Sequence, residues 1–80
     1  MSDDSPSEIL IWNVSKTFQE IRLDAEMNQY QAAALLGKSQ SRIHFIERGD
    51  LDMKLSTVAD YADIYGYDVT VSFNKREGGT

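Results

Sequence analysis

Residues 28–49 read NQYQAAALLGKSQSRIHFIERG, and this stretch decides the fold because it predicts two short helices separated by a tight turn. Asn28 followed three residues later by Gln31 is the pattern of a capping box, in which each side chain bonds a backbone N–H group at the start of a helix. Small and apolar residues continue to Gly37, which can adopt the left-handed conformation that commonly ends a helix. The sequence therefore predicts a short helix ahead of this glycine.

A second helix is predicted directly after the turn. Ser39 is a suitable N-cap for a helix over residues 40–48, and Gly49 can end it. The apolar residues Ile43 and Ile46 are three positions apart and therefore share one face. A helix, a glycine turn and a helix form the arrangement that places the second helix of the pair in the major groove of DNA.

The charge of the chain is unevenly distributed. Its formal net charge is −5, from 8 Lys and Arg against 13 Asp and Glu, which argues against a nucleic-acid partner for the chain as a whole. Residues 28–48 instead hold three basic residues and one acidic residue, and the remainder holds five basic and twelve acidic residues. The predicted second helix begins with Gln40, Ser41 and Arg42, whose side chains can meet base edges or phosphates. This local basic stretch predicts a surface for DNA.

A long helix is predicted upstream, beginning at Pro6. Ser5 and Glu8 match a second capping box, and proline is favoured at the first helical position because no backbone donor is needed there. One stripe at helical spacing is expected to face the core: Leu10, Val14, Phe18, Ile21 and Ala25. In a competing interpretation residues 9–14, which are rich in branched and aromatic side chains, form a strand. Residues 1–4 are expected to be a disordered tail.

The apolar period changes towards the carboxyl end. Residues 55–65 carry apolar side chains at helical spacing, and Gly66 can end that helix. Residues 68–73 then alternate apolar and polar, which predicts a β-strand, and residues 74–80 are expected to be a flexible tail. A strand needs a partner for its backbone N–H and C=O groups, and unless residues 9–14 are extended the chain offers none. We therefore expect the strand to pair across the twofold axis of a homodimer.

Composition bounds the remaining possibilities. Eighty residues allow one domain, expected over residues 5–73, and 41% hydrophobic with 26% charged residues is ordinary for a globular protein. The absence of cysteine excludes disulfides, thiolate zinc sites and thiol catalysis. No apolar run reaches the roughly 20 residues that span a bilayer, and no nucleophile–base pair or nucleotide-binding loop is recognisable. We expect a cytoplasmic, nucleoid-associated protein that is not an enzyme and binds no metal, cofactor or membrane.

The two helices and their glycine turn resemble the helix-turn-helix of the Cro/C1 family, also called the XRE family. The matching residues are Gln29 at the opening of the first helix, Ala33 at its middle, Gly37 in the turn and the closing residues 46–49, IERG. The resemblance covers about residues 14–66. It implies a small, mainly α-helical, lambda-repressor-like domain of about four helices, here with the C-terminal β-strand in addition.

The chain also departs from the usual form of that family. Residues 26–28, Glu-Met-Asn, stand where members often have Gly-Leu-Ser or Gly-Leu-Thr, so the turn must be built without glycine. The usual fifth helix is missing, and the predicted strand over residues 68–73 takes its place. This ending resembles the HipB-like and HigA-like DNA-binding antitoxins, in which a C-terminal strand can pair with the same strand of the partner.

The resemblance implies roles for individual residues. Contacts to base edges are expected from Gln40, Ser41, His44 and Phe45. Contacts to phosphates are expected from Gln29, Lys38, Ser39, Arg42, Arg48 and Lys54. The expected dimer interface comprises Trp12, Val69, Val71 and Phe73. Phe45 could instead be a core residue beside Ile46, and Glu47 is expected to be structural, through a hydrogen bond or ion pair within the domain.

The function expected from these observations is sequence-specific regulation of transcription. The predicted protein is repressor-like and binds a palindromic operator as a homodimer through the helix over residues 40–48. The acidic remainder of the chain also suits an antitoxin that neutralises a basic toxin. A phage Cro-like repressor or a restriction-modification controller, without a toxin partner, is the alternative.

Overall fold

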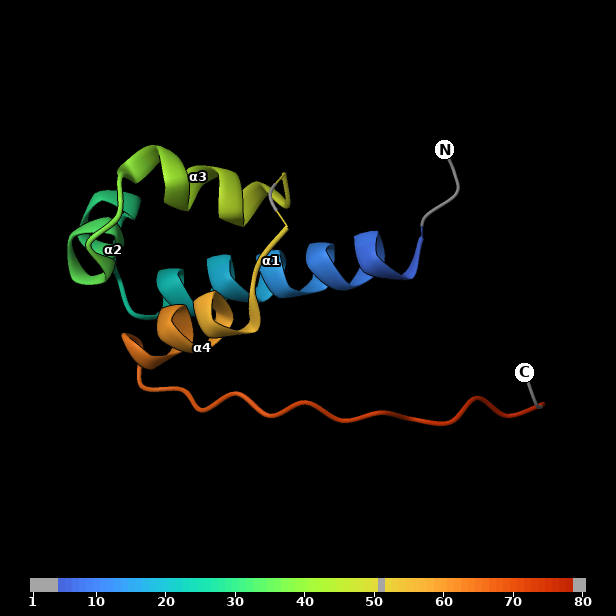
Figure 1. Cartoon of the computed structure of the whole chain (residues 1–80). Helices are drawn as coiled ribbons and strands as arrows, with labels where there is room; N and C mark the ends of the chain where they lie inside the picture. Colours follow the sequence, from blue (N-terminus) through green and yellow to red (C-terminus); the bar gives the residue numbers. More distant parts are fainter. Residues whose placement is uncertain (1–4, 51, 79–80) are drawn as a thin grey trace.

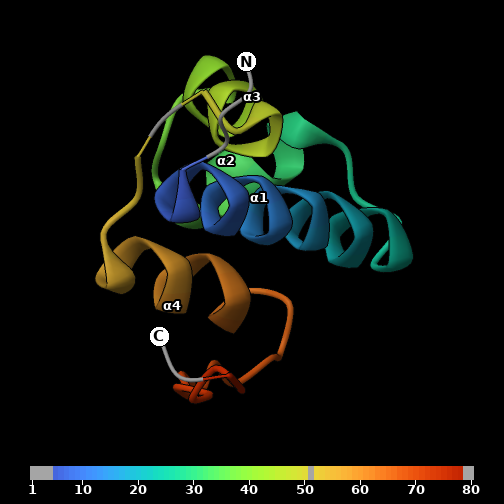
Figure 2. The same cartoon turned by 90° about the vertical axis from the view of Figure 1, so that its right-hand side faces the viewer.

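Four α-helices are present in the computed structural model, which describes residues 5–50 and 52–78 (Figure 1). They are α1 (Pro6–Asp24), α2 (Gln29–Leu36), α3 (Gln40–Arg48) and α4 (Leu55–Asp63). Two perpendicular views agree that α1 lies in the middle, with α2 and α3 on one side of it and α4 on the other (Figures 1 and 2). The predicted helical fold is confirmed. Within the described residues, none of the helices is long and apolar enough to cross a membrane.

The first helix begins where the sequence predicts. The Ser5 Oγ accepts a hydrogen bond from the Glu8 backbone N–H at 3.2 Å, and the Glu8 Oε1 accepts one from the Ser5 N–H at 3.2 Å. Residues 9–14 are helical throughout, so the alternative of a strand there is wrong. The capping box of Ser5 and Glu8 starts the helix upstream of these residues, and the helix continues through them to Phe18 and Ile21 in the core, which outweighs their β preference.

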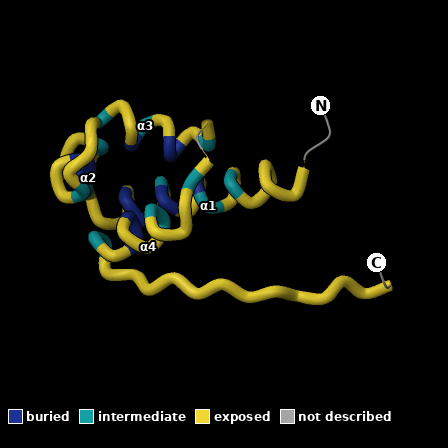
Figure 3. Tube along the Cα trace, viewed as in Figure 1, coloured by how far each residue is buried: buried dark blue, intermediate teal, exposed yellow. Residues whose placement is uncertain are grey.

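The apolar stripe of α1 is buried only over its centre. Phe18 and Ile21 are buried and Val14 is half-buried, whereas Leu10 is 63% exposed and Ala25 is exposed. The expectation that Leu10 and Ala25 face the core is therefore wrong for the single chain. For Leu10 the reason is length, because the first turns of α1 extend past the other helices and no helix covers them (Figure 3). Ala25 is the C-cap residue and lies beyond the last helical residue, Asp24.

The predicted pair of helices and its turn are confirmed at the level of individual caps. The Asn28 side chain accepts a hydrogen bond from the Gln31 N–H at 2.9 Å, and the Asn28 N–H donates to the Gln31 Oε1 at 2.8 Å. Gly37 ends α2 with φ 67°, a left-handed conformation that glycine adopts without strain. The Ser39 Oγ then accepts from the Arg42 N–H at 3.1 Å. Ser39 is therefore the N-cap of α3, which begins at Gln40.

The core lies where α1, α2, α3 and α4 meet. Its buried apolar residues are Phe18, Ile21, Ala32, Ala33, Ile43, Ile46, Tyr61 and Ala62. The rings of Phe18 and Tyr61 are stacked, with centroids 4.1 Å apart, which joins α1 to α4. Ile43 and Ile46 contribute the inner face of α3, so the opposite face of that helix is left for solvent or a ligand.

The C-terminal segment differs from its prediction. The last helix ends at Asp63 and is followed by a turn to Gly66, which has φ 84°. Residues 67–76 then run extended along α4 and past the start of α1 (Figure 1), and none of the described residues is in a β-strand. A strand is defined by its ladder of hydrogen bonds, and with residues 9–14 helical the single chain has no second strand to supply one. The strand predicted over residues 68–73 is thus absent from the isolated chain.

Candidate nucleic-acid interface

The face of α3 that is turned away from the core carries the predicted reading residues. Ile43, Ile46 and Glu47 are buried, whereas Ser41 and Phe45 on the opposite face are exposed. Because the helix advances about 100° per residue, Ser41, Phe45 and Arg48 form one outward stripe. α3 itself lies at the edge of the molecule (Figure 1).

Phe45 belongs to the outward stripe and not to the core. Its side chain is 42% exposed, so the alternative that it packs inward beside Ile46 is wrong. His44 is half-buried, and its ring meets the Phe45 ring edge-on, with centroids 5.7 Å apart. The two rings together present an apolar surface next to polar groups, which is suited to the methyl group of thymine in a major groove.

A hydrogen bond joins the first residues of α2 and α3. The Gln40 Nε2 donates to the Gln29 Oε1 at 2.7 Å, and the Gln29 Nε2 donates to the Glu47 Oε1 at 3.2 Å. A carboxylate only accepts hydrogen bonds, so Glu47 determines which end of the Gln29 amide faces it. Gln29 must then accept from Gln40, and the Gln40 amide keeps its carbonyl oxygen for another partner. Gln40 is therefore held in one orientation before any ligand binds.

Glu47 is the centre of a buried polar network that we call the Glu47 network, consisting of Arg22, Gln29, Glu47 and Tyr61. The Arg22 Nε donates to the Glu47 Oε2 at 2.7 Å, and the Arg22 Nη2 donates to the Glu47 Oε1 at 2.9 Å. The Tyr61 hydroxyl also donates to Oε2. These residues come from α1, α2, α3 and α4 in turn, so one carboxylate ties all four helices together. The expectation of a structural Glu47 is confirmed.

The electrostatics of this network favour an ionised Glu47. Burial raises the pKa of Glu47, but the hydrogen bonds from Arg22, Tyr61 and Gln29 and the positive charge of Arg22 lower it by more, so the net pKa lies below its ordinary value of 4.5. The hydrogen bond to Glu47 raises the pKa of Arg22, and burial together with the neighbouring carboxylate raises the pKa of the Tyr61 hydroxyl. The guanidinium and the hydroxyl therefore both keep their protons while Glu47 is charged.

Acidification is expected to destabilise the domain through Glu47. Because its folded pKa is lower than its unfolded pKa, the stabilising contribution is present above pH 4.5 and is lost as the pH falls through the lower folded value. Urea unfolding curves recorded from neutral to acidic pH would measure this loss. Glu47→Gln removes the titrating group, so its stability should depend less on pH over the same range. An equal dependence in both proteins would assign the effect to other carboxylates.

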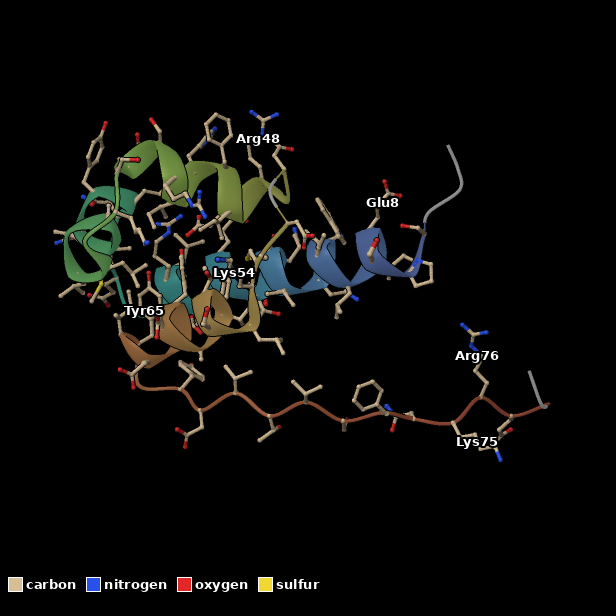
Figure 4. The ribbon with its side chains drawn as sticks, in the orientation of Figure 1. Glu8, Arg48, Lys54, Tyr65, Lys75 and Arg76 are labelled. Atoms are coloured by element: carbon tan, nitrogen blue, oxygen red, sulfur yellow. The ribbon has the colours of Figure 1, made fainter. Side chains whose placement is uncertain are left out.

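The cationic residues predicted to contact phosphates do not all lie together. Lys38, Ser39 and Arg42 are exposed around the turn and the first turn of α3. Arg48 points outward from the far end of α3, and its Nε lies 3.1 Å from the Asp50 Oδ2 on the surface (Figure 4). Figure 4 shows Lys54 beside the start of α4, away from the outward edge of α3. Every predicted DNA-contacting residue except Lys54 thus belongs to α2, to α3 or to the turn between them.

The residues expected at the dimer interface are likewise divided. Trp12 lies on the side of α1 near Gly49, where its Cε3 would be 3.9 Å from a methyl group placed on that glycine, and the Lys16 Nζ lies 5.4 Å from its ring centroid. Val69 and Val71 instead line a groove with Leu10 on another side of α1. Within one chain, Trp12 and the C-terminal segment therefore do not meet.

Sequence reasoning missed the partners of Glu47. The sequence predicts a structural role for Glu47 but does not identify Arg22 and Tyr61 as its partners. The available signal is the opposite charge of Arg22 and of Glu47 in the IERG motif of residues 46–49, but their spacing does not predict that the two side chains meet. Arg22 and Tyr61 are separated from Glu47 by 25 and 14 positions, so only the tertiary fold brings them to it.

Comparison with known proteins identifies the family of the chain. A family model described as helix-turn-helix, of the Cro/C1 type, matches residues 18–71, more than half of the chain. The matched region begins within α1, includes α2, α3 and α4, and ends in the extended segment. A search of the curated proteins found no match.

Proposed function

Because the chain belongs to the Cro/C1-type helix-turn-helix family of DNA-binding transcription regulators, we propose that it acts as a repressor by placing α3 in the major groove of a palindromic operator. The observation that supports this most directly is the outward stripe of α3, exposed and adjacent to the oriented Gln40. In this proposal Gln40, Ser41, His44 and Phe45 meet base edges. The cations around the turn and Gln29 meet phosphates.

The first test is selectivity for sequence. A gel-shift assay with DNA from upstream of the protein's own gene should show stronger binding than an equal length of random DNA. Binding to both should weaken steeply as the salt concentration rises, because phosphate contacts release counterions. Equal affinity for the two DNAs at every salt concentration would contradict a sequence-specific regulator.

Two substitutions in α3 should separate reading from positioning. Gln40→Ala is expected to relax the choice of base at one position of each half-site, at a cost of about 1–3 kcal/mol, whereas Arg42→Ala should weaken all sequences similarly and lower the salt slope by about one. Titrations against operator variants, repeated over a salt series, measure both effects. Lys16→Ala, which removes one positive charge from α1, is the charge-matched control. If both α3 variants bound like the parent, α3 would not be in the groove.

The proposed functional unit is a homodimer. A twofold axis would place two copies of α3 roughly 34 Å apart, one turn of B-form DNA, over the halves of a palindrome. Pairing of the extended segment over residues 68–73 with its symmetry mate would supply the ladder partner that the single chain lacks. Footprinting should then show protection with twofold symmetry. An asymmetric footprint covering a single half-site would contradict the homodimer on DNA.

A second candidate role is that of an antitoxin. It is favoured by the charge outside residues 28–48, where twelve acidic residues outnumber five basic ones and could bind a basic toxin. A phage Cro-like repressor or a restriction-modification controller would need no such partner. Co-expression with the neighbouring gene distinguishes them: an antitoxin should restore growth to cells that express it. If co-expression did not restore growth, the antitoxin role would be contradicted and only the role of a DNA-binding regulator would remain.

A further inference from the structure

An apolar groove separates the extended C-terminal segment from the first half of α1. It has a volume of about 380 Å³, and its walls include Leu10, Ile11 and Val14 of α1, Leu55 of α4, and Val69 and Val71 of the segment. Leu10 and Leu55 are 63% and 72% exposed, although both are large and apolar. Water is a poor occupant of such a surface, so the groove marks an interaction site.

The extended segment carries a large apolar side chain, Phe73, that could fill an apolar groove. Phe73 is 95% exposed, the most of any large apolar residue described. In an extended chain, side chains two positions apart lie on the same face, so Phe73 lies on the face of Val69 and Val71. It is nevertheless absent from the walls of the groove in its own chain. The groove of a second copy can receive it.

We propose that the partner's Phe73 occupies this groove in the homodimer, with the twofold axis passing through Val71. The proposal rests on the homodimer proposed above and specifies its register. In an antiparallel ribbon centred on Val71, Phe73 of each copy lies opposite Val69 of the other, and both side chains face the groove. The ribbon also gives the segment the hydrogen-bond partners that neither a helix nor a sheet provides in the single chain.

Side-chain pairing selects this register over its neighbours. Residues directly opposite each other share a face, so an apolar face is kept only if the axis passes through a residue. An axis at Ser72 would set Val69 opposite a lysine, Lys75. An axis at Thr70 would set Phe73 opposite Tyr67, which is outside the walls of this groove. The axis at Val71 avoids both.

The charge along the segment favours antiparallel pairing of two copies. Asp68 lies at its start, whereas Lys75 and Arg76 lie at its end, beyond the first turn of α1 (Figure 4). With the axis at Val71, Asp68 faces Asn74 of the other copy and is diagonal to Arg76, within reach of a long side chain. Opposite charges therefore meet at both ends of the ribbon.

The area is sufficient for a specific dimer. Each copy offers five exposed large apolar side chains here: Leu10, Leu55, Val69, Val71 and Phe73. Burying them from both copies removes on the order of 1,000 Å² from water, which is about the smallest area expected of a specific interface. The backbone hydrogen bonds of the ribbon add to this. A second copy of the chain is thus a complete occupant of the groove.

Single-cysteine variants test the register, because the chain has no cysteine of its own. Val71→Cys should form a disulfide-linked dimer under mild oxidation, since a residue on the axis lies opposite itself at about 4.5–5.5 Å between Cα atoms. Thr70→Cys and Ser72→Cys are the matched controls, and each should link at least tenfold more slowly. Fastest linkage at either control position, or none at all three, would overturn the proposed register.

Replacement of the aromatic ring tests the occupant of the groove. Phe73→Ala should raise the dissociation constant of the dimer at least tenfold in sedimentation equilibrium. Tyr30→Ala is the matched control and should not change it, because Tyr30 is an exposed aromatic residue of α2 outside the groove. Because Phe73 is exposed in the single chain, circular dichroism should show unchanged helices in both variants. An unchanged dissociation constant for Phe73→Ala would overturn the proposal.

The results also separate this proposal from the homodimer itself. A parent protein that sediments as a monomer at all concentrations, and protects a single half-site, contradicts the homodimer and the inference together. A dimeric parent with a symmetric footprint but no linkage through Val71→Cys contradicts the inference alone. In that case the interface lies elsewhere, and Trp12→Ala would be the next variant to sediment.

Discussion

Glu47→Ala is expected to lower the free energy of unfolding by about 3–5 kcal/mol. The substitution removes the carboxylate but leaves the Arg22 guanidinium buried, where its Nη1 still donates to the Met27 carbonyl oxygen at 2.8 Å. It also leaves the Tyr61 hydroxyl without its acceptor. A domain of this size is stable by roughly 4–12 kcal/mol, so the loss is a large share of the total. Urea unfolding followed by circular dichroism measures it.

A double variant controls for the loss of a charge as such. Arg22→Met combined with Glu47→Leu removes both buried charges and fills similar volume with apolar groups, which is often neutral or stabilising. We expect the double variant to be more stable than Glu47→Ala, although Gln29 and Tyr61 still lose a partner. If Glu47→Ala lost less than about 1 kcal/mol, the value typical of a surface pair, the Glu47 network would not be what holds the four helices together.

The helices could be predicted from sequence because their ends are set locally. Ser5, Asn28 and Ser39 cap within three residues of their own positions, and Gly37 and Gly49 end helices through their own backbone conformation. Such signals do not depend on the rest of the fold. The prediction of a C-terminal strand was wrong because a strand does not depend on local signals alone. Alternation indicates an extended chain, but a strand also requires a hydrogen-bonded partner strand, which the single chain does not supply.

The functional surface was only partly predictable for the same reason. The outward position of Phe45 follows from helical spacing once Ile43 and Ile46 are assigned to the core. The bond between Gln40 and Gln29 does not follow from spacing, because it depends on how closely the starts of α2 and α3 approach. The exposure of Leu10 near the start of α1 could not be predicted, because periodicity gives the direction of a side chain but not whether another element covers it.

Tyr61→Ala is the second substitution with a large expected effect, a loss of about 3–5 kcal/mol in the free energy of unfolding. The Tyr61 side chain is fully buried and its ring stacks on Phe18 with centroids 4.1 Å apart, so truncation leaves a cavity between α1 and α4. The hydroxyl bond to Glu47 is lost as well. Urea unfolding again provides the measurement, with the slope of the transition compared with that of the parent to confirm two-state behaviour.

Tyr61→Phe separates the two contributions to that loss. It keeps the ring and its stacking on Phe18 but removes the hydroxyl that donates to Glu47, and a hydrogen bond to a charged group contributes about 1.5–3 kcal/mol. We expect a smaller loss than for Tyr61→Ala. The folded pKa of Glu47 should also rise, because one of the hydrogen bonds that lower it is gone, so acid unfolding should begin at a higher pH. Equal losses for the two variants would instead assign the whole effect to the hydroxyl, since the ring would then contribute nothing that alanine cannot replace.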